Sequence, residues 1–309
     1  MKMNLRPTLR FSQTCMNPRR VGAMQKIFFQ VLMVGLTVFL SSSAGADSFT
    51  FSTGDPNGLI ATASRPDSAG KFEIESADDF IVNSKTSITS ATFTGLLTGA
   101  TPTVGQVVIE IYRVFPNDSD VGRTSGPPTF STPQVPTRVN SPSDVAFDSR
   151  LSGSGLTFTV TTLSSTFTAN NSVLPGGIHQ FPNQTTLGNG PVTGTEVRFN
   201  VTFTVPFLLP SDHYFFIPQV EVGGGEFLWL SAPRPIVAPG TPFLPDLQSW
   251  TRDQFLDPDW LRIGGDIVGG GSAFNAAFSL SGVTAVPEPG TLVLMSFGLA
   301  ALAKWRRRR

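Results

Sequence analysis

The stretch EVRFNVTFTV, residues 196–205, decides the fold class of this chain. Apolar residues alternate in it with polar ones, and this period of two places Val197, Phe199 and Val201 on one face of a strand. Turn-forming clusters of Gly, Pro, Asn and Asp separate further stretches of the same kind. We therefore predict about ten strands in an all-β domain, an antiparallel β-sandwich of the jelly-roll kind with one face of each strand in water. The other alternating stretches are residues 48–52, 88–94, 107–114, 156–160, 213–222, 226–230 and 273–280.

The aromatic composition agrees with packed sheets. The chain contains 26 Phe but only 2 Tyr. A buried Phe needs no hydrogen-bond partner, whereas surfaces that bind sugars or peptides commonly use Trp and Tyr, which carry a polar group. We therefore interpret most of the aromatic residues as core rather than as a ligand surface.

A formal net charge of zero conceals two basic ends and an acidic middle. Eleven of the 22 Lys and Arg residues lie within residues 1–26 and 304–309. The middle contains the other 11 Lys and Arg residues and 21 of the 22 Asp and Glu residues. Its net charge is therefore about −10. It has no basic stripe to meet phosphates, so we exclude nucleic acid as a partner.

The N-terminal end has the pattern of a secretory signal peptide. Its apolar run IFFQVLMVGLTVFL, residues 27–40, follows a lysine and is too short to cross a bilayer comfortably. Ala44 and Ala46 then form a small-residue cleavage signature. Residues 1–46 are therefore predicted to be a signal peptide with an N-terminal extension, read by the secretion translocon and cut by signal peptidase.

Two details follow from this cleavage site. Translation can start at Met1 or at Met24, since both precede the apolar run. The mature chain would begin at Asp47 and would lack Cys15, the only cysteine, so no disulfide is expected in it.

The C-terminal end contains a second short apolar run, residues 291–303, with the sequence TLVLMSFGLAALA. A helix of this length rises about 20 Å, less than the ~30 Å hydrocarbon core, so it would hold only with its flanking residues at the interface. The following positive charges would stay on the cytoplasmic side of the inner membrane and leave the body outside. The predicted anchor residues are Leu292, Leu294, Leu299, Trp305, Arg306, Arg307, Arg308 and Arg309.

Directly before this run stand Pro287, Glu288 and Pro289. Pro-Glu-Pro, a short apolar helix and a terminal arginine cluster, in this order, resemble the PEP-CTERM sorting signal of exosortase substrates. The resemblance covers residues 285–309 and implies that an exosortase reads these three residues, cuts near them, and releases the body to the cell surface or to exopolysaccharide. The alternative is a permanent tail anchor after a Pro-rich linker.

Between the two ends, residues 47–284 form the predicted β-sandwich domain. One long stretch in it, residues 232–260, interleaves tryptophans with carboxylates and is expected to be a loop. Trp250, Asp257, Asp259 and Trp260 could form a glycan or Ca²⁺ site, or the tryptophans could pin the loop onto the sandwich. We favour the second interpretation.

Candidate chemistry elsewhere is sparse. Asn117, Asp118 and Asp120 offer oxygen ligands in a turn, which suits Ca²⁺ only weakly because the twelve-residue binding loop of hand-type sites is missing. Asp78 and Asp79 are adjacent, so on a strand they would point to opposite faces and not cooperate. His213 is expected at the surface, and no nucleophile signature accompanies it.

These observations predict an exported, surface-sorted and non-enzymatic component of the extracellular matrix or envelope of a Gram-negative bacterium. No catalytic residue is predicted, and no cofactor apart from the weak Ca²⁺ site. Two alternatives stay open: a carbohydrate-binding or adhesive module that uses the 245–260 stretch, and a secreted hydrolase.

Overall fold

The computed structural model describes residues 47–119, 135, 138–178, 185–233, 247–270, 274–285 and 298. The unit Ala46–Ala285 is compact. The predicted signal peptide and almost all of the predicted sorting and anchor segment lie outside the described residues. Within the described ranges, no helix combines the length and the apolar character needed to cross a membrane.

The predicted all-β class is confirmed, because strands make up most of the described chain. Two short helical turns accompany them, the 3₁₀ turn η1 (Pro175–Gly177) and the π turn η2 (Ile263–Val268). The strands are β1 (Asp47–Ser52), β2 (Ile60–Ala63), β3 (Ile74–Val82), β4 (Thr86–Leu97), β5 (Thr103–Arg113), β6 (Asp148–Ser152), β7 (Gly155–Ala169), β8 (Asn171–Val173), β9 (Val192–Leu209), β10 (Asp212–Gly223), β11 (Phe227–Ala232), β12 (Trp250–Asp253), β13 (Leu261–Arg262), β14 (Asn275–Ala276) and β15 (Phe278–Thr284).

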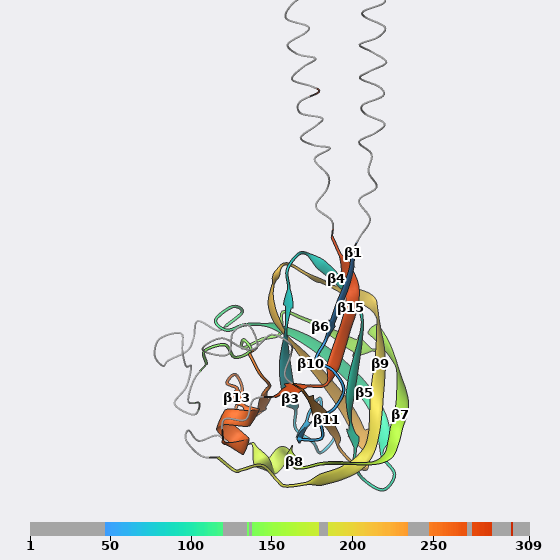
Figure 1. The fold of residues 1–309 in the computed structure, drawn as a ribbon, viewed down its shortest axis with the longest axis vertical. Helices are drawn as coiled ribbons and strands as arrows, with labels where there is room; N and C mark the ends of the chain where they lie inside the picture. Colours follow the sequence, from blue (N-terminus) through green and yellow to red (C-terminus); the bar gives the residue numbers. More distant parts are fainter. Residues whose placement is uncertain are drawn as a thin grey trace, which may run out of the picture. The chain divides into compact units, whose positions relative to one another are not determined.

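The strands belong to one mixed sheet in the order β13-β12-β3-β10-β5-β6-β7-β9-β4-β11-β2-β8. β15 joins β4, and β1 joins β15 (Figure 1). β14 joins β11. The predicted purely antiparallel arrangement is wrong at two places, since β2 and β8 are parallel, as are β6 and β7. Between β6 and β7 the chain makes a tight loop in which Gly153 and Gly155 both have positive φ. After this loop, β7 runs in the same direction as β6.

The sheet folds back on itself around a core rich in phenylalanine. Rings of β15 and β1 meet rings of β10 and β3 across this core: Phe278 stacks on Phe216 at 5.0 Å, and Phe51 lies 6.1 Å from Phe80. Phe93 and Phe199 stack at 4.8 Å on the neighbouring strands β4 and β9. The prediction that most Phe residues are core residues is therefore confirmed.

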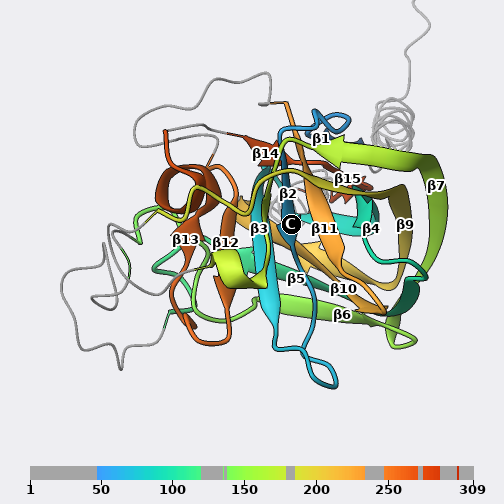
Figure 2. The same ribbon diagram turned by 90° about the horizontal axis from the view of Figure 1, so that it is seen from below.

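The prediction that each strand keeps one face in water is wrong for β3, β10 and β11. β10 is buried on both faces: Tyr214 and Phe216 point into the main core, while Phe215 and Ile217 belong to a separate cluster with Trp250 and Trp260. The reason is that β12 pairs with β3 and brings the segment after residue 247 over the second face (Figure 2).

Candidate functional site

The two ends of the described domain lie side by side. β1 begins at Asp47, the predicted first residue of the mature chain, and Asp47 pairs with Thr284 at the end of β15 (Figure 1). The predicted sorting segment follows directly after this pair. The residues expected to be cleaved, read or inserted lie outside the described residues: Ala44, Ala46, Pro287, Glu288, Pro289, Leu292, Leu294, Leu299, Trp305, Arg306, Arg307, Arg308 and Arg309.

The predicted ligand loop packs against the sheet through its two tryptophans. Trp250 is on β12 and Trp260 just precedes β13, and the side chains of both are fully buried. Their indole N–H groups donate to the backbone oxygens of Leu247 (3.1 Å) and Ser143 (3.0 Å). A glycan ring cannot stack on a buried indole, so this burial favours the interpretation in which the tryptophans pin this stretch to the sheet.

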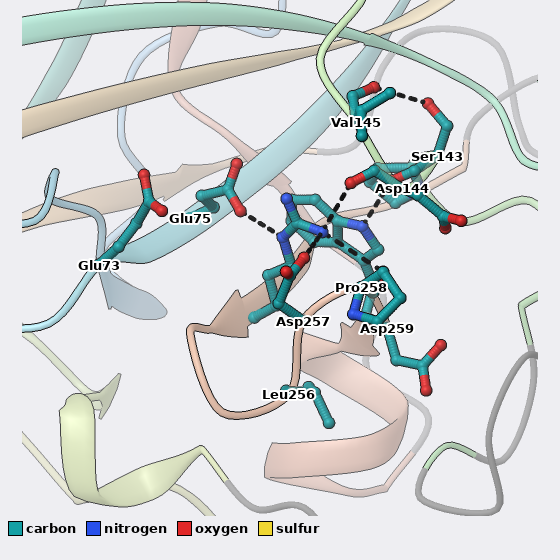
Figure 3. Close-up of polar contacts among 12 residues, drawn as sticks. Glu73, Glu75, Ser143, Asp144, Val145, Leu256, Asp257, Pro258 and Asp259 are labelled. Atoms are coloured by element: carbon teal, nitrogen blue, oxygen red, sulfur yellow. Dashed lines mark hydrogen bonds and ion pairs between the residues drawn. The ribbon is translucent and has the colours of Figure 1, made fainter. Parts of the chain in front are cut away.

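The two carboxylates of the same stretch bind arginines. Asp259 is buried and lies 2.7 Å from Nη1 of Arg138. The exposed Asp257 lies 2.6 Å from Nη1 of Arg252, and Figure 3 shows Asp257 and Asp259 on the same loop. To take part in the predicted Ca²⁺ or glycan site, either carboxylate would have to give up its ion pair.

Arg138 holds this region together, and sequence reasoning missed it because it stands in a Pro- and Ser-rich stretch without periodicity. Its guanidinium is completely buried and also contacts Asp144 at 3.1 Å. The remaining N–H groups donate to Ser141 Oγ and to the backbone oxygens of Pro142 and Pro258.

A cluster of three carboxylates lies beside this ionic network. Oxygens of Glu73, Glu75 and Glu110 all lie within 4.8 Å of one another, and Figure 3 shows Glu73 and Glu75 next to each other. The sheet register brings them together: Glu75 of β3 is paired with Arg252 of β12. Ile217 of β10 is paired with Glu110 of β5, so Gln219, two residues further on, lies on the same face as Glu110.

The polar contacts within the cluster are unevenly shared. Glu75 accepts hydrogen bonds from Arg252 Nε and from the Tyr112 hydroxyl at 2.7 Å, and Arg252 Nη2 donates to that hydroxyl at 3.0 Å. Gln219 Nε2 donates to both Glu73 and Glu110 at 3.2 Å. Within the described part of the chain, Arg252 makes its direct ion pair in this cluster with Glu75, and its charge acts on Glu73 and Glu110 from a greater distance.

Burial and mutual repulsion raise the acid pKa values here. Burial, followed by the charge of Glu75, a hydrogen bond from protonated Glu110 to Glu75 and the charge of Glu73, raises the pKa of Glu110 to about 9. The pKa of Glu73 is also raised, again by burial first and by Glu75 second. A periodic signal was present in the sequence, because Glu73 and Glu75, like Glu110 and Tyr112, share a strand face at a spacing of two.

The weak Ca²⁺ site predicted at Asn117, Asp118 and Asp120 lies only partly within the described residues. Both carboxylate oxygens of Asp118 accept hydrogen bonds from Arg113, one of them at 2.6 Å. Asn117 lies in the same turn, and Asp120 lies outside the described residues. Asp118 therefore neutralises an arginine of β5, and Ca²⁺ binding in this turn stays a prediction.

Asp78 and Asp79 have separate partners, as their adjacency on a strand predicts. Asp78 accepts hydrogen bonds from Ser249 Oγ and the Ala276 backbone N–H. Asp79 lies 2.5 Å from His213 Nε2, so the histidine expected at the surface is instead paired and largely buried. Among the described residues, no serine hydroxyl hydrogen-bonds the His213 ring.

Comparison with known proteins concerns the end that follows β15. A family model described as the PEP-CTERM protein-sorting motif matches residues 285–309. The tail is a PEP-CTERM sorting motif. The PEP-CTERM motif indicates an exported chain that an exosortase processes. No curated protein and no solved structure matches the chain.

Proposed function

We propose that this PEP-CTERM protein is a non-enzymatic component of the bacterial envelope or extracellular matrix, delivered there by secretion and exosortase processing. In this proposal the apolar run 291–303 holds the chain transiently in the inner membrane. The translocon and signal peptidase act at its N-terminal end, and exopolysaccharide is a candidate partner after release.

The pairing of Asp47 with Thr284 carries the proposal. Both processing sites, one before Asp47 and one after Ala285, flank a single pair of strands at the margin of the sheet. The strands β1 and β15 are complete without either terminal segment, so removal of both segments leaves their pairing intact.

A second observation supports a structural rather than a chemical role. The buried charged side chains of Arg138, Asp144 and Asp259 bind one another and join the 138–147 and 254–260 stretches. Mutually satisfied ion pairs of this kind are suited to fixing a conformation, which supports a structural role for this region.

Intact-mass measurement of the protein recovered from cells, cell surface and medium tests the proposal. We expect a species that begins at Asp47 and ends near Pro287, Glu288 and Pro289, without the arginine cluster. Glu288→Gln should leave the tail attached because it alters the motif, whereas the exposed proline variant Pro233→Ala should be processed normally. A tail retained in wild-type cells would instead identify a permanent anchor.

The role of the released body is tested separately. We expect the mature protein to bind exopolysaccharide from the producing cells. We also expect it to turn over no substrate in a panel of glycosidase, esterase and protease substrates. Hydrolysis of any of these substrates that survives repurification would replace the matrix role by the hydrolase alternative.

A further inference from the structure

The outer edge of β7 has no partner strand over much of its length. On its inner side β7 pairs with β9 from Leu156 to Ala169. On its outer side β6 pairs only with Gly155 and Leu156, and no described strand pairs with residues 157–162. Figures 1 and 2 show β7 at the margin of the sheet, with β9 beside it. Alternate residues of this stretch therefore present backbone N–H and C=O groups to which another strand can bind.

The two halves of β7 differ in how regular this edge is. From Leu163 onward the pairing with β9 is bulged, and Ser164 Oγ accepts a hydrogen bond from the backbone N–H of Thr166. Bulges of this kind are one way in which natural sheets protect an exposed edge. The register between Leu156 and Thr162 contains no bulge. Residues 157–162 therefore form a regular open edge, about as long as an average strand.

This open edge also lacks the residues that keep sheet edges apart. Its sequence is TFTVTT, which has high β-propensity and contains neither Gly nor Pro. No Lys, Arg, Asp or Glu occurs anywhere between Arg150 and Glu196. Edge strands commonly carry a charge or a proline, and a strand without either is prone to pair with another chain. Val160 is 37% exposed although its register partner Phe199 is buried, so an added strand would also cover apolar surface.

A second copy of the chain is the partner that fits this edge. An oppositely charged protein would find no counter-charge on residues 157–162, whereas a copy brings no charge that has to be neutralised. The acidic bodies of two copies repel each other, so they approach most easily where neither carries a charge. The charged residues paired with β7, Arg198 and Glu196, have opposite signs and lie one strand further in, on β9.

We propose that two copies of this protein associate edge to edge through residues 157–162 of β7, in antiparallel orientation. Such a pair is symmetric, so centring it on Val160 places Thr159 of each copy opposite Thr161 of the other. Threonine pairs across antiparallel strands stabilise the pairing. Each copy uses its free edge once, and the association therefore closes at a dimer. The proposal does not depend on the matrix role.

Sedimentation equilibrium of the full-length chain in density-matched detergent tests the proposal. We expect a monomer–dimer equilibrium for the wild type. Thr159→Lys combined with Thr161→Lys should weaken dimerisation by at least about tenfold, because like charges then stand opposite each other at two places. Thr159→Glu combined with Thr161→Glu should have the same effect. An equimolar mixture of these two double variants should form a heterodimer, because the opposed charges then attract.

The control carries the same substitutions on the neighbouring strand. Thr202→Lys combined with Thr204→Lys changes two exposed threonines of β9 and should leave dimerisation unchanged. Cooperative thermal unfolding of each variant shows that it is folded. The two terminal apolar segments are identical in all of these proteins, so a difference between the variants does not come from them.

Three results would overturn the proposal. A wild type that stays monomeric at about 0.1 mM, where even a weak dimer is populated, would leave this edge to a strand of a different protein. A dimer that persists in the β7 lysine variant would place the contact elsewhere. Equal losses in the β7 and β9 lysine variants, with no heterodimer in the mixture, would show an effect of overall charge and not of strand pairing.

Discussion

At the scale of single residues, the guanidinium of Arg138 illustrates how the buried charges are used. It lies among Asp144, Asp259 and three further oxygen acceptors, so each of its N–H directions is occupied. Removing such a cation from water costs several kcal/mol, and hydrogen bonds of this completeness are needed to offset that cost. The two aspartates depend on Arg138 as much as it depends on them.

We therefore expect Arg138→Met to lower the free energy of unfolding by about 3–5 kcal/mol, because it leaves two buried carboxylates without their cation. Urea unfolding followed by tryptophan fluorescence measures the change. The control is Arg198→Met, which removes an ion pair with the exposed Asp55 and should cost less than about 1 kcal/mol. Equal losses in the two variants would contradict the role given to Arg138.

At the scale of secondary-structure elements, strand register decides which side chains meet. β10 lies between β3 and β5, and it places Gln219 between Glu73, which directly precedes β3, and Glu110 of β5. A shift of the register by one residue would turn these polar side chains toward the phenylalanine core. The cluster is therefore a product of the pairing and not of any one strand.

The same cluster predicts how stability depends on pH. Glu110 faces Glu73, Glu75, Tyr112 and Arg252, and its pKa is raised from 4.5 to about 9. Between these values the folded chain keeps a proton that the unfolded chain loses, so the free energy of unfolding falls as the pH rises.

The slope contributed by this one group is at most about 1.4 kcal/mol per pH unit. Glu110→Gln should remove that contribution, so its stability should exceed that of the wild type increasingly from pH 6 to about pH 9. Urea unfolding in buffers across this range measures the difference. Parallel pH curves for the two proteins would show that Glu110 is already ionised at neutral pH.

At the scale of the whole molecule, the first and last strands of the described domain form one antiparallel pair. Ser48 is paired with Val283, and β15 in turn pairs with β4, so β1 is joined to the rest of the described sheet through β15. The chain therefore leaves the described domain toward the two predicted processing sites at neighbouring positions, Asp47 and Thr284.

A designed disulfide tests this closure of the chain. Ser48→Cys with Val283→Cys should form a disulfide on export, because directly opposed residues have Cβ atoms about 4.5–5.5 Å apart and the mature body has no other cysteine. Mass spectrometry and non-reducing gels detect the bond, which could raise the free energy of unfolding by at most about 5 kcal/mol. Ser48→Cys with Ser279→Cys, four residues out of register, should stay reduced; efficient cross-linking there would refute the pairing.

The pattern of neighbouring residues along the chain determined the all-β class, the phenylalanine core and the sorting tail. Strands β5, β9 and β10 fall on alternating stretches of the sequence, and the PEP-CTERM motif is contiguous, so neighbouring residues suffice to recognise them. Only the tertiary structure decided that Trp250 and Trp260 are buried, that β10 is covered on both faces, and that Arg138 binds Asp259, 121 residues away. Such contacts depend on which strands pair and in which register, and the period of two is the same for every strand and does not encode that choice.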